Sequence, residues 1–193
     1  MYKRQQVITA ALAKEGYPVI MACLDPEKAA SLCNRIQQET GNTQIEVRRI
    51  DLASLSSVNN FTGQLLKEGR PVSRLMNNAG ILTTPVRKTE DGLETIVSVN
   101  YVAPYMLTRQ LLPLMQPGCR IVNTVSCTYA IGRIEPDFFE KGRNGRFFRI
   151  PVYSNTKLAL LLFTQELAER LQNQGITINA SDPGICLLYT SDA

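Results

Sequence analysis

Histidine and tryptophan are both absent from this chain of 193 residues. Without histidine the chain cannot build a Ser-His-Asp or Cys-His catalytic group, and it lacks the commonest side-chain ligand of metals. Its five cysteines, at positions 23, 33, 119, 127 and 186, form no C-x-x-C pair. We therefore expect reduced, mostly buried thiols of the kind found in cytoplasmic proteins, and no metal site.

Long apolar runs and strong charge are also missing. No run approaches the roughly 18 residues that cross a bilayer, so no membrane segment is evident in the sequence. The 21 basic and 17 acidic residues leave a formal charge of +4, and this small excess is spread along the chain. A nucleic-acid-binding domain would need a concentrated basic face, which is not found outside residues 133–149. We therefore expect no nucleic-acid partner.

Short apolar runs alternate with helical patterns along the chain, which predicts one α/β domain with a mainly parallel sheet. Strands are expected at residues 17–23, 45–51, 73–77, 120–125 and 176–180. Helices are expected at residues 6–16, 26–40, 54–68, 90–115 and 153–174. The segment 127–152 is expected to be a solvated insertion, or alternatively a loop that shapes a substrate pocket.

Tyr153 and Lys157 stand four residues apart and therefore share one face of a predicted helix. A lysine charge held near a phenol favours the phenolate, which lowers the tyrosine pKa from its usual value of about 10. A tyrosine tuned in this way can transfer a proton to or from a carbonyl or an alcohol. The pair alone is a weak signal, because an ordinary solvated helix face gives the same spacing.

Four further motifs follow one another in a fixed order. They are RRIDLASL at residues 48–55, MNNAGI at 76–81, RIVNTVS at 120–126 and KLALLLFTQELAERL at 157–171. Together with the Tyr-Lys pair they closely resemble the short-chain dehydrogenase/reductase family, in the branch that contains retinol dehydrogenases and related carbonyl reductases. The resemblance runs from about Gln6 to Ile185 and implies a Rossmann-like, doubly wound parallel sheet.

The resemblance implies a role for each matching residue. Tyr153 becomes the general acid/base, and Lys157 lowers its pKa while binding the nicotinamide ribose. Ser126 orients and polarises the substrate carbonyl, and Asn100 supports a water in a proton relay. Two plainer interpretations stay open, in which Ser126 is a strand-end cap and Asn100 a helix distortion. The cofactor-binding residues that the resemblance implies are Asp51, Leu52, Asn78, Ala79, Gly80, Tyr153, Lys157, Pro183 and Gly184.

The implied activity is that of an NAD(P)-dependent oxidoreductase that interconverts a carbonyl and an alcohol by hydride transfer. The choice between NAD and NADP stays open, because Leu24 occupies a position where similar proteins often carry arginine. Asp25 either binds the ribose or only caps the helix after it. The expected substrate is a small carbonyl or alcohol. The full-length protein is expected to form a homo-oligomer, since the apolar run 158–163 resembles helices that pair subunits in this family.

A non-catalytic, Rossmann-like dinucleotide-binding or regulatory protein is the alternative function. The presence of Ser126, Tyr153 and Lys157 together argues against it, because a scaffold has no need of that combination.

Two parts of the family pattern have no counterpart in the sequence. One is the T-G-x-x-x-G-x-G turn, whose glycines let backbone amides approach the cofactor pyrophosphate. The other is the substrate lid, with a helix and a strand, that follows Pro183-Gly184 in the family. We therefore expect residues 6–185 to be a partial domain, truncated at both ends and inactive by itself.

The two termini share a possible origin at the DNA level. The DNA sequence CTGTCTCTTATACACATCTGACGC, read from its second base, can encode residues 186–193. The reverse complement of its first half, TATAAGAGACAG, can encode residues 2–5. Such an inverted repeat resembles a transposon-type sequencing adapter. We therefore expect residues 1–5 and 186–193 to be non-native, and the fold prediction excludes them.

Overall fold

The computed structural model describes residues 2–83, 86–136, 138–139 and 149–184. Ile185 and the expected adapter-derived tail 186–193 therefore lie outside the described residues, as do residues 137 and 140–148 of the insertion 127–152. The chain divides into two compact units, residues 1–51 and 52–193, and each is considered by itself. All ladders between the named strands are parallel, and helices alternate with strands, which confirms the predicted α/β class.

The first unit contains two helices and a pair of parallel strands. Its elements are α1 (Tyr2–Lys14), β1 (Val19–Cys23), α2 (Pro26–Thr40) and β2 (Ile45–Arg49). Helix α2 has the predicted bounds because Asp25 accepts a hydrogen bond from the N–H of Lys28 and Gly41 ends the helix at φ +71°. Helix α1 includes residues before Gln6, where the sequence analysis had placed its start.

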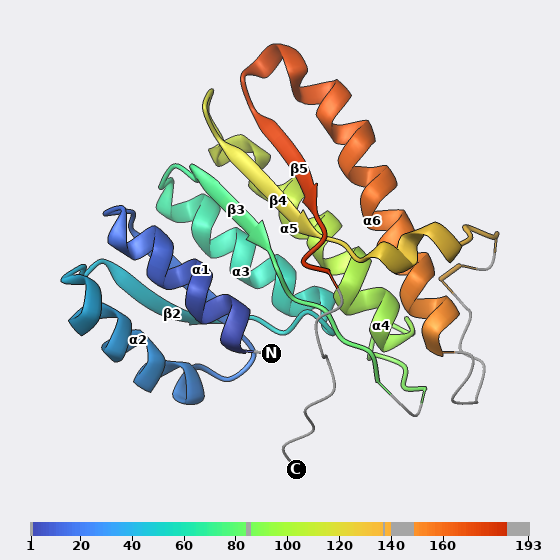
Figure 1. The fold of residues 1–193 in the computed structure, drawn as a ribbon, viewed down its shortest axis with the longest axis horizontal. Coiled ribbons are helices and arrows are strands. Elements are labelled where there is room, and N and C mark those ends of the chain that lie inside the picture. The colour runs from blue at the N-terminus through green and yellow to red at the C-terminus, as the bar shows by residue number, and fades with distance from the viewer. Residues whose placement is uncertain (1, 84–85, 137, 140–148, 185–193) are drawn as a thin grey trace. The chain divides into compact units, whose positions relative to one another are not determined.

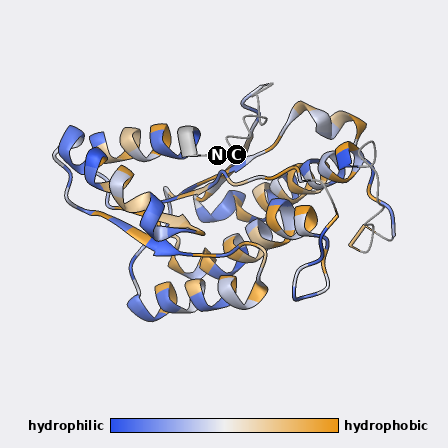
Figure 2. Cartoon of the chain, turned by 90° about the horizontal axis from the view of Figure 1, so that it is seen from below, coloured by the Kyte–Doolittle hydropathy of each residue, from blue (hydrophilic) through white to orange (hydrophobic). Residues whose placement is uncertain are grey.

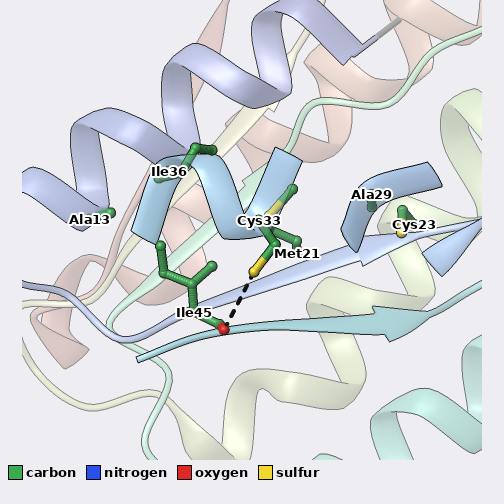
Figure 3. Close-up of a cluster of buried hydrophobic side chains, with 7 residues drawn as sticks. All are labelled: Ala13, Met21, Cys23, Ala29, Cys33, Ile36 and Ile45. Carbon is green, nitrogen blue, oxygen red and sulfur yellow. Dashed lines mark hydrogen bonds between the residues drawn. The ribbon is translucent and has the colours of Figure 1, made fainter. Parts of the chain in front are cut away.

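A small hydrophobic core fills the first unit (Figure 3). On α2, three of its side chains stand at helical spacing and therefore share one face. The Cys33 thiol also lies 3.6 Å from the carbonyl oxygen of Ile45, which links α2 to β2. The buried members of the cluster are Ala13, Met21, Cys23, Ala29, Cys33, Ile36 and Ile45.

The second unit is a three-stranded parallel sheet with helices packed against it (Figure 1). Its strands are β3 (Arg74–Asn77), β4 (Arg120–Thr124) and β5 (Thr177–Ser181), in the order β3-β4-β5. Its longer helices are α3 (Leu55–Glu68), α5 (Ala103–Leu111) and α6 (Arg149–Leu171). Helix α3 packs on α5, and α6 packs on β4 and β5. Hydrophobic and hydrophilic residues both occur along the helices of the chain (Figure 2). The buried residues of α3, at positions 58, 61, 62 and 65, have the spacing of one helix face.

The two sheets match the two sets of strands in a doubly wound fold. In the order 3-2-1-4-5-6, the first strand separates strands 3 and 2 from strands 4, 5 and 6. The described residues form one sheet of β1 and β2 and another of β3, β4 and β5.

The prediction of one long helix over residues 90–115 is wrong in its start and in its regularity. The backbone is helical only from α4 (Thr95–Val97), because Gly92 has φ +78° and the Glu94 carboxylate caps the N–H groups of the first helical turn. A π-helical segment, Ser98–Val102, follows α4 before α5 begins. Helix α6 includes Arg149, one turn before its predicted start. None of the helices in the described part of the chain is both long and apolar enough to cross a membrane.

Candidate active site

Tyr153 and Lys157 lie on the buried face of α6, with only 8% and 2% of their surfaces exposed. The Lys157 ammonium is 5.5 Å from the centroid of the Tyr153 ring. It also donates a 2.8 Å hydrogen bond to the carbonyl oxygen of Thr124, the last residue of β4. The pair is therefore not the solvated helix face of the plainer interpretation.

Gly80 approaches this ammonium from the segment that follows β3. A β-carbon built on Gly80 would lie 3.3 Å from the Lys157 Nζ and 3.7 Å from the Asn100 Oδ1. Only a residue without a side chain allows this close approach at no steric cost. The structure therefore brings together three of the predicted site residues, Gly80, Asn100 and Lys157.

Asn100 lies in the π-helical segment, so the predicted helix distortion is present. Its side-chain amide accepts from the Ile81 N–H at 2.8 Å and donates to the Ile81 carbonyl at 2.9 Å. The same amide lies 3.4 Å from the Thr156 hydroxyl, which donates to the carbonyl oxygen of Tyr153. Such π-helical bulges are frequent at functional sites. Asn100 therefore connects the segment after β3 to helix α6.

Ser126 follows β4 and is half-buried. It caps the 3₁₀ turn Cys127–Ile131, where its Oγ lies 3.5 Å from the Thr128 N–H and 3.3 Å from the Thr128 hydroxyl. The strand-end cap of the plainer interpretation is thus present. A hydroxyl that accepts these weak bonds still has its own proton to donate, so its role toward a substrate carbonyl stays a prediction.

The segment after Ser126 is packed closely on α6. A β-carbon on Gly132 would lie 2.6 Å from the Ser154 carbonyl oxygen, and the Arg133 N–H donates to Asn155 Oδ1 at 2.7 Å. Farther along, Phe138 is buried and meets the Tyr101 ring edge-on at 5.6 Å. The described part of the insertion is therefore anchored at these points, while most of its described residues, 127, 129–131, 133–136 and 139, are exposed, as the predicted solvated insertion requires.

The remaining residues predicted to bind cofactor are more dispersed. Asp51 ends the first unit, whereas Leu52 begins the second, where its carbonyl accepts a 3.0 Å hydrogen bond from Ser98. Asn78 and Ala79 are half-buried directly after β3. Pro183 and Gly184 are exposed after β5, in a turn where the Gly184 N–H donates to Asp182 Oδ1 at 2.9 Å.

A buried polar network between strands and helices escaped the sequence analysis. Asn77 and Asn123 face each other in register on β3 and β4, and their amides are hydrogen-bonded at 2.8 Å. Asn77 also donates to Thr108 on α5, and Asn123 donates to Thr164 on α6, both at 2.9 Å. The asparagines inside the predicted strands were the available signal, because a buried amide needs such partners.

The sequence analysis also missed a buried ion pair between Glu94 and Arg149, because it had placed Glu94 inside a predicted helix. Its carboxylate lies 2.7 Å from the Arg149 guanidinium. In the described part of the chain, no three His, Cys, Asp or Glu side chains gather in a group that could hold a metal ion.

A groove of about 550 Å³ lies beside the hydrophobic cluster of Tyr153, with which it shares Phe138 and Ala159. It is lined by the outer faces of α5 and α6 and by the segment around Phe138, and it contains neither Ser126, Tyr153 nor Lys157. Burial raises the pKa of Tyr101, which lines this groove, and the neighbouring Tyr105 adds to the effect.

Comparison with known proteins shows the family and the fold of the chain. Residues 6–190 match a family model described as enoyl-(acyl carrier protein) reductase. The chain is 37% identical over 176 residues to human retinol dehydrogenase 13 and 38% identical over 178 residues to mouse retinol dehydrogenase 12. The chain belongs to the short-chain dehydrogenase/reductase family. The two matches cover 90% and 91% of this chain but only 53% and 56% of those proteins, so the chain spans about half their length.

Solved structures share the fold. An uncharacterised protein from Mycobacterium paratuberculosis superimposes with a TM-score of 0.79 and 34% identity, over 93% of this chain and 63% of that one. A short-chain dehydrogenase from Sphingobium yanoikuyae in complex with NADPH gives a TM-score of 0.72 at 22% identity, over 92% and 64% of the two chains. The Rossmann-like fold predicted from the sequence is therefore confirmed.

Proposed function

We propose that the full-length protein is an NAD(P)-dependent oxidoreductase that interconverts a carbonyl and an alcohol. The observation that carries this proposal is the buried Lys157 ammonium, held by the Thr124 carbonyl beside the Tyr153 ring. A buried cation is costly unless it is bonded, so a site that keeps one beside a phenol is a candidate for proton transfer. Family membership of residues 6–190 supports the same reaction class.

The proposed step divides the work between cofactor and chain. The nicotinamide, when bound, supplies or accepts the hydride at the substrate carbon. In the reductive direction Tyr153 donates its phenolic proton to the carbonyl oxygen, and in the oxidative direction it takes the alcohol proton back. The Lys157 charge stabilises the phenolate that forms, and the Ser126 hydroxyl orients the oxygen. Asn100 holds Ile81 and Thr156, and so keeps the helix and the Gly80 segment in place for this step.

The residues present fit a dinucleotide in part. The absence of a side chain at Gly80 leaves room for the Lys157 ammonium, which is the group that would bind the nicotinamide ribose. The glycine turn that binds the pyrophosphate has no counterpart in this sequence, so we expect this chain by itself to bind the cofactor weakly.

The choice between NAD and NADP is still open. The Asp25 carboxylate accepts from the Lys28 N–H at 3.2 Å and lies 3.1 Å from the Lys28 ammonium. These contacts hold the pKa of Asp25 below its ordinary value and support a capping role over ribose binding. A metagenomic short-chain oxidoreductase of the same fold was solved with NADP, at 23% identity and a TM-score of 0.72. We write the cofactor as NAD(P) for this reason.

The substrate proposed is a small carbonyl or alcohol, and the names of the related retinol dehydrogenases favour an apolar one. We also propose a homo-oligomer that pairs through α5 and α6, where Leu162 is 47% exposed beside the groove described above. The absence of a nucleic-acid partner and a cytoplasmic location both stay predictions.

Titration of NADPH and NADH into the full-length protein, followed by assays with a panel of aldehydes and ketones, tests this function. Tyr153→Phe should keep cofactor binding and lose turnover. Tyr17→Phe is a matched control, because Tyr17 belongs to the first unit and lines neither the groove nor the candidate site, and it should behave as wild type. Cofactor binding without turnover in any of the three proteins would favour the non-catalytic dinucleotide-binding alternative. No cofactor binding at all would overturn the dinucleotide assignment.

A further inference from the structure

A buried guanidinium, that of Arg149, joins three segments of the second unit. Its Nη2 lies 2.7 Å from Glu94 Oε1, and the two side chains are only 3% and 1% exposed. Two charges buried this deeply are costly to desolvate, and an apolar pair of similar size is often as stable. Stability alone therefore gives little reason for an ion pair at this position, and a geometric role explains it better.

The Glu94 carboxylate uses its two oxygens for different segments. Oε1 accepts from Arg149, whereas Oε2 accepts from the N–H groups of Ile96 at 2.7 Å and Val97 at 3.2 Å. These N–H groups belong to α4, which continues directly into the π-helical segment with Asn100. The ion pair therefore fixes the start of α6 to the helix that carries Asn100.

The other bonds of the guanidinium reach the segment that follows Gly80. Arg149 Nε donates to the Thr83 carbonyl at 2.6 Å, and Nη2 lies 3.3 Å from the Thr83 hydroxyl. Thr83 stands two residues after Ile81, whose backbone is held on both sides by Asn100. One side chain of α6 is thereby bonded to both segments that surround the Lys157 ammonium.

Arg149 stands four residues before Tyr153, one turn away on the same face of α6. Tyr153 belongs to a buried cluster with Ile96 and Val97, the two residues whose N–H groups Glu94 caps. A shift of the first turn of α6 would therefore move the tyrosine relative to α4. The titratable and charged groups around this cluster include Lys157, Tyr101 and the Glu94–Arg149 pair.

We propose that Arg149 is a positioning residue for proton transfer: its bonds to Glu94 and Thr83 set where Tyr153 lies relative to Lys157 and Asn100. This inference rests on the proposed function of Tyr153 as the acid/base. It assigns to Arg149 no contact with substrate or cofactor. Arginine serves these acceptors from two nitrogens of a rigid planar fork, Nε and Nη2, whereas the three donors of lysine radiate from one nitrogen on a flexible stem. We therefore expect Arg149→Lys to lose part of this arrangement.

The test compares four variants of the full-length protein: Arg149→Met, Arg149→Lys, Glu94→Gln and Arg170→Met. Arg170 is the matched control, since it lies on the same helix in an exposed pair with Glu166, at 2.6 Å and with side-chain exposures of 64% and 58%. One readout is the turnover number against pH at saturating cofactor. The other is the NMR titration of ring-labelled tyrosine, in which the Tyr153 signal is assigned by its loss in Tyr153→Phe. The titration needs neither cofactor nor substrate.

We expect the three variants at Arg149 and Glu94 to lose between about tenfold and a hundredfold in turnover, the range that small misplacements of catalytic groups produce. In Arg149→Lys, which keeps the positive charge, the Tyr153 titration should move upward, because the phenol is held less well beside the Lys157 charge. Arg170→Met should change neither readout. A purely structural role would lower the melting temperature and leave both readouts in the folded protein as in wild type.

Wild-type turnover and an unchanged Tyr153 titration in Arg149→Lys and Glu94→Gln would overturn the positioning role. These two milder variants decide the matter if Arg149→Met does not fold. Failure of the proposed function looks different, since wild type itself would then show no turnover. In that case the tyrosine titration still decides whether Arg149 positions Tyr153.

Discussion

Gly80 lies so close to Lys157 that a β-carbon on the glycine would be 3.3 Å from the lysine Nζ. The ammonium cannot move away freely, because it is buried and donates to the Thr124 carbonyl at 2.8 Å. The glycine follows β3, and Thr124 is the last residue of β4. Contacts with these two residues therefore hold the Lys157 ammonium between the ends of the two strands. The position of the Lys157 charge therefore depends on residues that do not themselves titrate.

Gly80→Ala should reduce turnover by about tenfold, which corresponds to about 1.4 kcal/mol of lost transition-state stabilisation. The added methyl group presses on the Lys157 ammonium and displaces it by a few tenths of an ångström. Gly63→Ala is the control, because Gly63 lies inside α3 and a β-carbon there meets no atom within 4 Å. Steady-state kinetics of both full-length variants checks this. Equal activity in the two would show that the contact has no catalytic consequence.

Gly132→Ala should destabilise the protein by about 1–3 kcal/mol, as overpacking of a tight contact does. The new methyl group would lie 2.6 Å from the Ser154 carbonyl oxygen, so the turn after Ser126 must move away from α6. Asn155→Ala, which removes only the acceptor of the Arg133 N–H, should cost less, about 0.5–1.5 kcal/mol. Urea unfolding of both variants measures the difference. The reverse order of the two costs would contradict this account of the turn.

The amides of Asn77 and Asn123 should be energetically coupled. Replacing either one by leucine leaves buried polar groups unpaired and should cost about 1–3 kcal/mol. The double variant should cost less than the sum, with a coupling of about 0.5–3 kcal/mol. A double-mutant cycle by urea unfolding measures this coupling. Asn59→Ala, in an exposed pair with Gln110, serves as control and should change stability by less than about 0.5 kcal/mol.

Thiol labelling should separate Cys127 from the other described cysteines. Burial raises the pKa of Cys23, Cys33 and Cys119, so less of the reactive thiolate is present in each at neutral pH. Cys127 is exposed. In a Cys186→Ser background one thiol should react rapidly at neutral pH and the other three slowly, with rates that rise as the pH is raised. Rapid reaction of more than one thiol in the folded protein would contradict the burial described.

Much of the fold follows from local patterns. Helix α2 was predicted with correct bounds because Asp25, Pro26 and Gly41 are strong local signals at its ends. The helix predicted for residues 90–115 failed because its start depends on Glu94. The Glu94 carboxylate that caps this helix is held by Arg149, which lies 55 residues away in the sequence. Local periodicity contains no information on such a contact.

The candidate site shows the same division. The spacing of Tyr153 and Lys157 is local, and it predicted a shared helix face. That this face is buried, and that Gly80, Asn100 and Thr124 surround the ammonium, depends on contacts between distant segments. The network of Asn77 and Asn123 likewise depends on strand register, which the sequence analysis did not address.

The central claim is that the protein directs a hydride to a carbonyl carbon while Tyr153 supplies the proton. In the most direct test, the full-length protein is incubated with aldehydes and ketones and with NADPH or NADH that is deuterated at the transferable position. The mass of the alcohol formed is then measured by mass spectrometry. We predict one deuterium on the carbinol carbon with wild type. Tyr153→Phe should bind the cofactor yet turn over at least about a hundredfold more slowly. Bound cofactor with no deuterium delivered to any carbonyl, or full turnover in Tyr153→Phe, would contradict the account.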